Sequence, residues 1–472
     1  MEIRLRDLPD QEFALMHDAT LRLLHDYGVL FEHEEAQRLL TKAGNEADSQ
    51  GRVHLKPKFV ESMLDLIPKN GFLLYGRDEN KTVHAAPGQI GFRPSTGAPF
   101  IYDYDLKQRR DATMDDARLM TTVADALENM TMVNAVVNPA GAPGGLGSVR
   151  LFVNAHRYSL KPSDVTVMTK EEVNLIGRIA AVIRGGEKAL REKPIVAVDV
   201  GMITPLRCAG EQVEAFLESA RWGMPVEVLT SPAMGLSGPV TVSGSTLLAT
   251  AETIAALCLI YQVAPGLGII STSRVSPLNM RTSEYNYGAP ELGMASALSC
   301  AQSARYHIPC DMYGFGTCAK APGVQATMEK IFSGMLMCLG QPYMVTGGGI
   351  LENALTTSPD QLVIDNEAAR FIKRIRKPME VTEDALGLTA LAEGMKTSGH
   401  VMGEEHTIRY LKRGELLDAG LGQWSAPGVM EETVTDLLER AHHRRMQILA
   451  THHVPPFEPA VDREIRKLLG DD

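Results

Sequence analysis

Tryptophan and cysteine are scarce in this chain, with 2 and 6 among its 472 residues. The six cysteines, at positions 208, 258, 300, 310, 318 and 338, include no C-x-x-C pair. This absence argues against a zinc ribbon and against a thioredoxin-type redox site. We therefore expect reduced thiols, most of them buried as small hydrophobic side chains.

Positive charge is also in short supply, because 47 Lys and Arg face 58 Asp and Glu for a net charge of −11. Proteins that bind nucleic acid or anionic membranes need a basic face, so neither partner is expected. The first residues show no apolar run of signal-peptide length, and apolar stretches such as 253–263 are too short to span a bilayer. The sequence thus predicts a cytoplasmic protein.

Several catalytic signatures are missing too. No HExxH or clustered His and Asp follows a predicted strand, and no GxSxG nucleophile turn occurs. The adjacent pairs His442-His443 and His452-His453 point to different sides of a helix, which favours a solvated helix face over chelation. The sequence therefore predicts no metal site.

Glycine, in contrast, is abundant, with 42 residues, and from residue 89 onward short apolar runs alternate with longer amphipathic ones. The candidate strands are 90–93, 130–137, 164–168, 195–201, 226–231, 268–273, 309–314 and 342–347. Helical patterns follow most of them, and Thr113 and Asp116 predict a capping box before the helix at 114–127. About eight such units predict an α/β fold, a (β/α)₈ TIM-type barrel. A doubly wound open sheet is the alternative, but its GxGxxG phosphate loop is missing.

The chain on either side of this pattern reads as helical. Helices are expected at 10–28, at 34–42 and after Pro57, and a long one at 430–449. We predict three parts: an N-terminal helical extension (1–88), the barrel (89–376) and a C-terminal helical extension (377–472). The last helix makes a subunit contact plausible, so a homo-oligomer is expected.

Nearly every loop that follows a predicted strand contains Gly, Pro or a small hydroxyl residue, and barrels of this kind build their sites from these loops. Because such loops carry mostly small side chains, they predict a wide opening, the mouth of the barrel, at the carboxyl ends of the strands. A bulky molecule could dock on this opening. The triple glycine Gly347–Gly349 offers backbone amides that could bind an anion, although close packing explains it equally well.

Several segments, taken in order, resemble the trimethylamine methyltransferase superfamily. They are Tyr287-Gly288-Ala289-Pro290-Glu291, the Lys320-x-x-x-x-Gln325-x-x-x-Glu329-Lys330 pattern, Gly347–Glu352, Asp365-Asn366-Glu367 and Glu404-Glu405-His406-Thr407. Residues 28–32 and the predicted hairpin at 97–105 are also similar, so the resemblance covers nearly the whole chain. It implies a (β/α)₈ barrel that transfers a methyl group from an amine nitrogen to the cob(I)alamin of a separate small corrinoid protein, with no tightly bound cofactor of its own.

Founding archaeal members of that superfamily carry pyrrolysine in the region that corresponds to 310–320, where this chain has only standard residues. In lacking pyrrolysine there, the chain resembles the glycine betaine methyltransferases, which act on quaternary amines. A quaternary nitrogen leaves as a neutral amine, so the resemblance implies positioning without a general base, and no catalytic residue is assigned.

A quaternary ammonium is held by aromatic faces, each contributing about 0.5–2 kcal/mol. The aromatic candidates are Phe92, Tyr102, Tyr313, Phe315 and Tyr343. A betaine carboxylate would bind Arg93, Arg274 or the amides around Gly348. Possible carboxylates for the cation or the mouth are Asp311, Glu352 and Glu405, with His406 beside the last. Two alternatives stay open: a corrinoid-linked enzyme for another methyl donor, and a non-catalytic subunit that docks the corrinoid protein.

Overall fold

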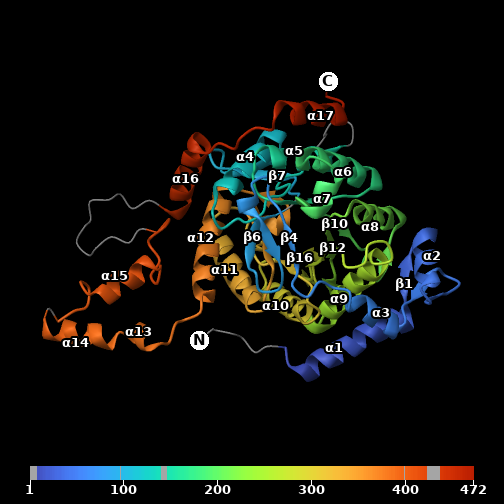
Figure 1. The fold of residues 1–472 in the computed structure, drawn as a ribbon, viewed down its shortest axis with the longest axis horizontal. Helices are drawn as coiled ribbons and strands as arrows, with labels where there is room; N and C mark the ends of the chain where they lie inside the picture. Colours follow the sequence, from blue (N-terminus) through green and yellow to red (C-terminus); the bar gives the residue numbers. More distant parts are fainter. Residues whose placement is uncertain (1–7, 96, 140–145, 398, 423–435, 472) are drawn as a thin grey trace.

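The computed structural model describes residues 8–95, 97–139, 146–397, 399–422 and 436–471. Figure 1 shows a curled sheet surrounded by helices, with the N-terminal helices packed on one flank and three C-terminal helices reaching away from the other. The predicted α/β class is confirmed, because parallel strands alternate with helices along the middle of the chain.

The central sheet has seven strands in the order β6-β18-β17-β14-β12-β10-β9. They are β6 (Gly91–Pro94), β9 (Ser163–Thr166), β10 (Val196–Gly201), β12 (Val226–Thr230), β14 (Ile269–Ser273), β17 (Cys310–Tyr313) and β18 (Met344–Gly348). Every neighbouring pair is parallel. Consecutive strands lie side by side because helices connect them, and the first strand pairs with the last.

The two edge strands, β6 and β9, approach each other. Arg93 of β6 forms an ion pair with Asp164 of β9, so the sheet must curl until its edges come close. Between them runs the segment after α4, where Met130 makes a single parallel bridge to Phe92 and Val133 another to Ser163. The sequence predicts a strand at 130–137, whereas the structure has only isolated bridges there.

Helices cover the convex face of the sheet, as Figure 1 shows. They are α4 (Met114–Ala126), α5 (Gly147–Arg157), α6 (Lys170–Arg184), α7 (Glu187–Glu192), α8 (Gly210–Trp222), α9 (Val242–Ile260), α10 (Pro290–Arg305), α11 (Val324–Cys338) and α12 (Pro359–Arg376). The predicted capping box is confirmed: the Thr113 side chain accepts a hydrogen bond from the Asp116 amide, and Asp116 accepts one from the Thr113 amide. Gly185 and Gly223 end α6 and α8 in the left-handed conformation.

Residues 8–88 contain the predicted helices but also short strands. The helices are α1 (Asp10–Arg22), a π turn (Leu23–Tyr27), α2 (Glu34–Lys42) and α3 (Pro57–Leu64). The strands are β1 (Val29–Phe31), β2 (Glu46–Ala47), β3 (Arg52–His54), β4 (Phe72–Leu74) and β5 (Val83–Ala85). The prediction of helices alone was wrong because strands of two or three residues are too short for alternation to be read.

Helix α9 lies at the centre of the contacts between the N-terminal segment and the sheet. By length and composition it could cross a membrane, but 83% of its most apolar 18-residue window is buried inside the structure. Helices α1, α2 and α3 pack on its outer face, while β12 and β14 lie beneath it. Its apolar character on all sides is therefore that of a core helix.

Shorter strands lie in the loops that connect the strands of the central sheet. A hairpin of β7 (Phe100–Asp103) and β8 (Gln108–Asp111), near the predicted position 97–105, pairs through β20 (Thr356–Thr357) with β19 (Ile350–Leu351). The others are β11 (Arg207–Cys208), β13 (Ala233–Met234), β15 (Ser276–Asn279) and β16 (Glu284–Tyr285). Within the loops, 3₁₀ turns lie at Glu79–Lys81 and Glu352–Ala354.

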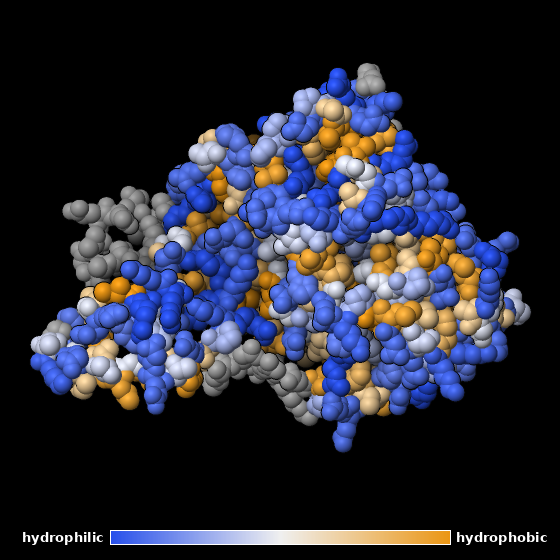
Figure 2. All heavy atoms as spheres, in the orientation of Figure 1, coloured by the Kyte–Doolittle hydropathy of each residue, from blue (hydrophilic) through white to orange (hydrophobic). Residues whose placement is uncertain are grey.

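Beyond α12 the chain forms an arm and then returns. The arm comprises α13 (Glu383–Leu386), α14 (Leu388–Lys396) and α15 (Glu405–Lys412), which extend away from the sheet in Figure 1. Helix α16 (Leu437–Thr451) packs on α12 and α4, and α17 (Pro459–Leu469) packs on α6. The start of the helix predicted at 430–449 lies outside the described residues. Figure 2 shows apolar side chains exposed among the hydrophilic ones of the arm.

Candidate active site

Charged side chains line the concave face of the sheet. Arg93 of β6 donates hydrogen bonds to Asp311 of β17 and to Glu227 of β12, and it pairs with Asp164 of β9. These strands lie at both edges and in the middle of the sheet, so the contacts must cross its concave side. Because side chains alternate along a strand, the residues two positions further along face the same space.

Arg93 ties these strands together while fully buried. Burial by itself would lower the pKa of its guanidinium, but the carboxylates of Asp164, Asp311 and Glu227 raise that pKa well above its ordinary value. Its Nε donates to Thr346 Oγ1 at 2.7 Å, and Thr346 donates in turn to Asp311 Oδ1 at 2.5 Å. Arg93 therefore stays charged and has its donors directed at the protein itself.

Arg274 and Tyr313 lie nearer the carboxyl ends of the strands. The Arg274 guanidinium is 4.3 Å from the centre of the Tyr313 ring, and its Nη1 donates to the Asp311 carbonyl at 3.1 Å. The Tyr313 hydroxyl lies 2.6 Å from Ser95 Oγ. A cation and an aromatic face thus stand together at the end of the sheet where such folds bind ligands.

Two more tyrosines continue this group toward the surface. The ring centres of Tyr313 and Tyr287 are 5.4 Å apart, and those of Tyr287 and Tyr285 are 5.7 Å apart. Tyr313 is buried and Tyr285 is exposed, so the three rings lead inward from solvent. The sequence placed Tyr287 in a family motif without giving it a binding role, and the loop that carries it offered no periodic signal.

Three buried carboxyls on neighbouring strands complete the concave face. Burial first, and then the charge of Asp164, raise the pKa of Asp199 to about 7. Burial also raises the pKa of Asp164, and that of Glu227 well above its ordinary value. Asp164 and Glu227 were not predicted as site residues. The available signal was a carboxylate inside an apolar strand, a position that acidic residues seldom occupy unpaired.

Of the predicted site residues, Arg93, Arg274, Asp311 and Tyr313 are brought together in one network. Three of the other four aromatic candidates lie elsewhere, whereas Tyr343 lies in the interior, close enough to Glu227 and Arg93 for their charges to act on its buried hydroxyl. Phe92 and Phe315 stack with ring centres 5.6 Å apart in the core that contains α4 and α12 residues, on the convex side. Tyr343 precedes β18 and contacts Met132, while Tyr102 packs against Leu351 and Ala319.

The remaining predicted side chains also have other partners. Glu352 forms an ion pair with Arg109 at 2.7 Å beside the hairpin. Glu405 and His406 belong to α15 of the arm, where His406 Nε2 lies 2.9 Å from the Asp384 carbonyl. The expectation that they line the mouth is thereby corrected, because the arm carries them away from the strand ends (Figure 1).

The triple glycine is held by a buried ion pair. Lys330 of α11 and Asp365 of α12 are 2.6 Å apart; Lys330 also donates to the Gly347 carbonyl, and Asp365 accepts from the Gly349 amide at 2.7 Å. The Gly348 carbonyl accepts from the Ser95 amide. A Cβ at position 347 would meet the Phe315 carbonyl at 2.7 Å, and φ is +115° there. Close packing thus accounts for this glycine, and the Gly349 amide has a protein partner.

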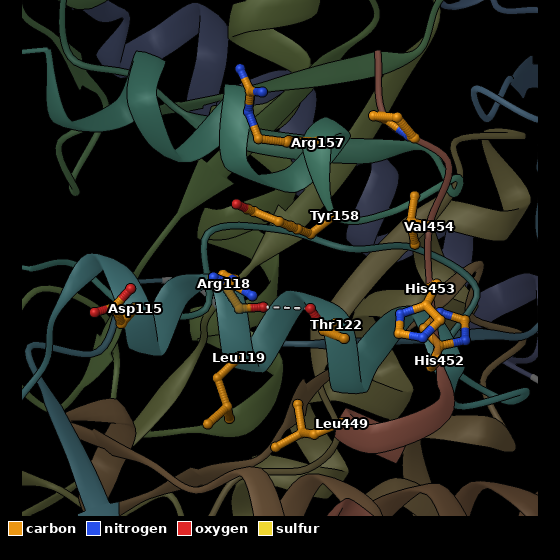
Figure 3. Close-up of a pocket in the computed structure, with 11 residues that line it drawn as sticks. Asp115, Arg118, Leu119, Thr122, Arg157, Tyr158, Leu449, His452, His453 and Val454 are labelled. Carbon is orange, nitrogen blue, oxygen red and sulfur yellow. Dashed lines mark hydrogen bonds between the residues drawn. The ribbon is translucent and has the colours of Figure 1, made fainter. Parts of the chain in front are cut away.

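A groove of about 660 Å³ lies on the outer surface, between α4, the end of α5 and residues 449–456. Figure 3 shows Arg118, Leu119 and Thr122 on one face of α4, with His452 and His453 opposite. His452 lies 2.8 Å from Asp125, and Arg157 pairs with Asp462, so polar groups here join the C-terminal segment to the body. His442, predicted on a solvated face, instead stacks on Tyr104 and lies 3.5 Å from Asp360.

Comparison with known proteins places these features in a family context. A family model described as trimethylamine methyltransferase (MTTB) matches residues 3–469. A glycine betaine methyltransferase of Desulfitobacterium hafniense (strain Y51) is 27% identical, with 98% of this chain and 96% of the relative covered. A trimethylamine methyltransferase MttB of the same species (strain DSM 10664 / DCB-2) is 26% identical, with 99% and 94% covered.

Among solved structures, the monomethylamine methyltransferase MtmB of Methanosarcina barkeri aligns with a TM-score of 0.50 and 12% identity, covering 93% of this chain and 88% of that one. A hydroxylamine complex of MtmB aligns with a TM-score of 0.53 at 11% identity, with the same coverage. At such low identity the likeness is one of fold.

Proposed function

The chain belongs to the trimethylamine methyltransferase (MTTB) family, and from that premise we propose that it moves a methyl group from a quaternary amine, glycine betaine or a related betaine, to the cob(I)alamin of a partner corrinoid protein. The relative with 27% identity, named as a glycine betaine methyltransferase, supports this choice of donor. We expect the protein to act in the cytoplasm and to form a homo-oligomer.

The observation that carries the proposal is the stacking of Arg274 on Tyr313 at the strand ends, with the Tyr287 ring packed beside that of Tyr313. A betaine has a carboxylate at one end and a methylated ammonium at the other. A guanidinium binds the first through charge-assisted hydrogen bonds, and tyrosine faces bind the second. The side chains can thus hold the substrate by both ends and present one methyl group outward.

The chemistry asks little else of these side chains. A quaternary nitrogen departs as a neutral amine, so no proton has to be delivered, and orientation supplies the main catalytic effect. The cobalamin belongs to the partner and supplies the nucleophile when the two proteins meet. Within this chain, the rigid Arg93 network keeps β6, β9, β12 and β17 in fixed register beneath the substrate position.

We further infer that the sheet closes into an eight-stranded barrel. The single bridges from Met130 to Phe92 and from Val133 to Ser163 support an eighth position between the two edge strands. The ion pair of Arg93 with Asp164 supports the same closure from inside. A closed barrel would leave the ends of β6, β14 and β17 around one opening, where a partner can reach the substrate.

The test is a donor screen with the purified protein and free cob(I)alamin. Glycine betaine, proline betaine, carnitine, γ-butyrobetaine, choline and trimethylamine are each supplied, and the demethylated amine is measured by mass spectrometry together with the spectrum of the cobalamin. We expect turnover of at least one betaine. Turnover of trimethylamine alone, or of none of these compounds, would refute the proposal.

A further inference from the structure

Asp164, Asp199 and Glu227 come from three consecutive strands, β9, β10 and β12, and are all buried. Each offers a carboxylate oxygen such that the three oxygens lie within 4.8 Å of one another. The sequence predicted no metal site, since no HExxH motif and no clustered His and Asp follows a predicted strand. These carboxylates meet only through the curl of the sheet, which no local spacing reveals.

Each of the three carboxylates uses one oxygen on the protein and leaves the other without a partner. Asp164 pairs with Arg93, Asp199 Oδ2 accepts from Thr166 Oγ1 at 3.0 Å, and Glu227 Oε2 accepts from Arg93 at 3.1 Å. The second oxygens, Asp164 Oδ2, Asp199 Oδ1 and Glu227 Oε1, are shielded from solvent and have no hydrogen bond. Unpaired buried oxygens are costly, so a ligand is called for.

The uncharged side-chain oxygen of Asn134 lies in the same space as the three carboxylates. Asn134 donates its amide to the Pro94 carbonyl at 2.9 Å, which leaves its buried Oδ1 without a partner. It follows Met132 by two residues, and Met132 reaches the interior to contact Tyr343, so Asn134 faces the interior as well. The Asp164 amide donates to the neighbouring Val133 carbonyl, which sets Asn134 beside Asp164.

The size of this space selects a bare ion. A point between three atoms no more than 4.8 Å apart lies within about 2.8 Å of each of them, close to the 2.3–2.6 Å of calcium–oxygen bonds. A quaternary ammonium is far too large, since its methyl groups keep the nitrogen well beyond such a distance. Mg²⁺ demands about 2.0–2.1 Å in near-ideal octahedral geometry and usually keeps several waters, so a buried site with several protein oxygens favours Ca²⁺.

The charge of the cluster selects a divalent ion. The charged groups that act on these carboxyls, among the described residues, are Arg93, Arg274 and Asp311. Four carboxylates therefore face two guanidinium groups, which leaves an excess of two negative charges when all are ionised. We propose that Asp164, Asp199 and Glu227, assisted by Asn134, bind one Ca²⁺ beneath the substrate position. Ligating carboxylates whose other oxygen is fixed by Arg93 or Thr166 are typical of preorganised metal sites.

The test measures binding and does not depend on methyl transfer. The full chain is treated with EDTA, returned to chelator-free buffer and titrated with CaCl₂ by isothermal calorimetry, and its unfolding temperature is followed with and without CaCl₂. We expect one Ca²⁺ to bind per chain and the unfolding temperature to rise, because an ion that binds only the folded state stabilises the folded state. Absence of any heat and of any shift would overturn the proposal.

The diagnostic variant is Asp199→Asn. Asp199 accepts a hydrogen bond from Thr166, so its replacement leaves the ion pairs and hydrogen bonds of Arg93 intact. It should weaken Ca²⁺ binding at least tenfold, because affinity depends on the number of charged ligands. The matched control is Glu252→Gln, another buried carboxyl, on α9 and bonded to Thr204 and Leu206. Equal Ca²⁺ affinity in the two variants, or tighter binding of MgCl₂ than of CaCl₂, would contradict the assignment.

Discussion

Arg274 is the side chain whose replacement should separate recognition of a carboxylate from recognition of an ammonium group. It stacks on Tyr313 at the strand ends. We expect Arg274→Gln to raise the KM for glycine betaine by about tenfold or more, since a hydrogen bond to a charged group contributes about 1.5–3 kcal/mol. Steady-state kinetics with choline, which has no carboxylate, provides the control. An equal change for both substrates would contradict the role of Arg274.

Glu252 provides a pH test at the same scale. Its buried carboxyl accepts hydrogen bonds from Thr204 Oγ1 and the Leu206 amide, and burial raises its pKa to about 7. The unfolded chain ionises this group near pH 4.5, so the wild type loses stability as pH rises from about 4.5 to 7. Glu252→Gln can keep both contacts. Its unfolding temperature should exceed that of the wild type by more at pH 8 than at pH 5. A constant difference would refute this assignment.

Individual site residues were predictable only in part. Arg93, Arg274, Asp311 and Tyr313 were found because residues at strand ends reach the mouth. Phe92 and Phe315 were grouped with them, yet both pack in the core on the convex side. Phe92 lies one position from the inward-facing Arg93, whereas Phe315 lies beyond the end of β17, where strand alternation no longer applies. One step along a strand reverses the direction of a side chain, and the sequence does not mark strand ends to within one residue.

At the scale of elements, the buried ion pair between α11 and α12 positions the triple-glycine loop. Asp365→Asn should lower the free energy of unfolding by about 3–5 kcal/mol, because it leaves the Lys330 ammonium buried without its counter-charge. Urea denaturation checks this. The control is Glu393→Gln, which breaks the exposed pair with Lys396 and should cost at most about 1 kcal/mol. Comparable losses in the two variants would show that burial does not set the cost.

Helices were more predictable than strands. Predicted and observed bounds of α2 and α4 agree within one residue, because capping residues and glycines mark helix ends directly. The predicted strand at 130–137 forms only isolated bridges. Helix α5 was missed although its pattern is amphipathic, because it follows a glycine-rich stretch that gives no helix-start signal. Strand pairing depends on distant partners, which a local pattern cannot supply.

At the scale of the whole molecule, the repeated strand–helix pattern was sufficient to predict a parallel sheet with consecutive strands as neighbours. It could not show how the edges meet, because that depends on Arg93 reaching Asp164 from 71 positions away. It also could not show the direction of the arm, whose helices have few contacts with the body to specify their place.

The arm gives a prediction about assembly. Leu388, Leu391 and Met395 share one face of α14 and are 69%, 47% and 77% exposed. We expect a second copy of the chain to cover them, because large exposed apolar patches usually mark interfaces. Substitution of all three by Ser should reduce the mass measured by light scattering, whereas Leu236→Ser, elsewhere and 73% exposed, should not. An unchanged mass in the triple variant would exclude this interface.

The packing of the first residues on later ones has a consequence for synthesis. Strand β1 pairs with β11 near residue 207, and α1, α2 and α3 rest on α9, which ends at Ile260. A ribosome makes α1, α2, α3 and β1 first, but these elements can be buried only after α9 and β11 have been made. The opening helices must therefore wait, with their apolar faces uncovered, until more than half of the protein has been translated, and this delay is the period in which a chaperone would have most to protect.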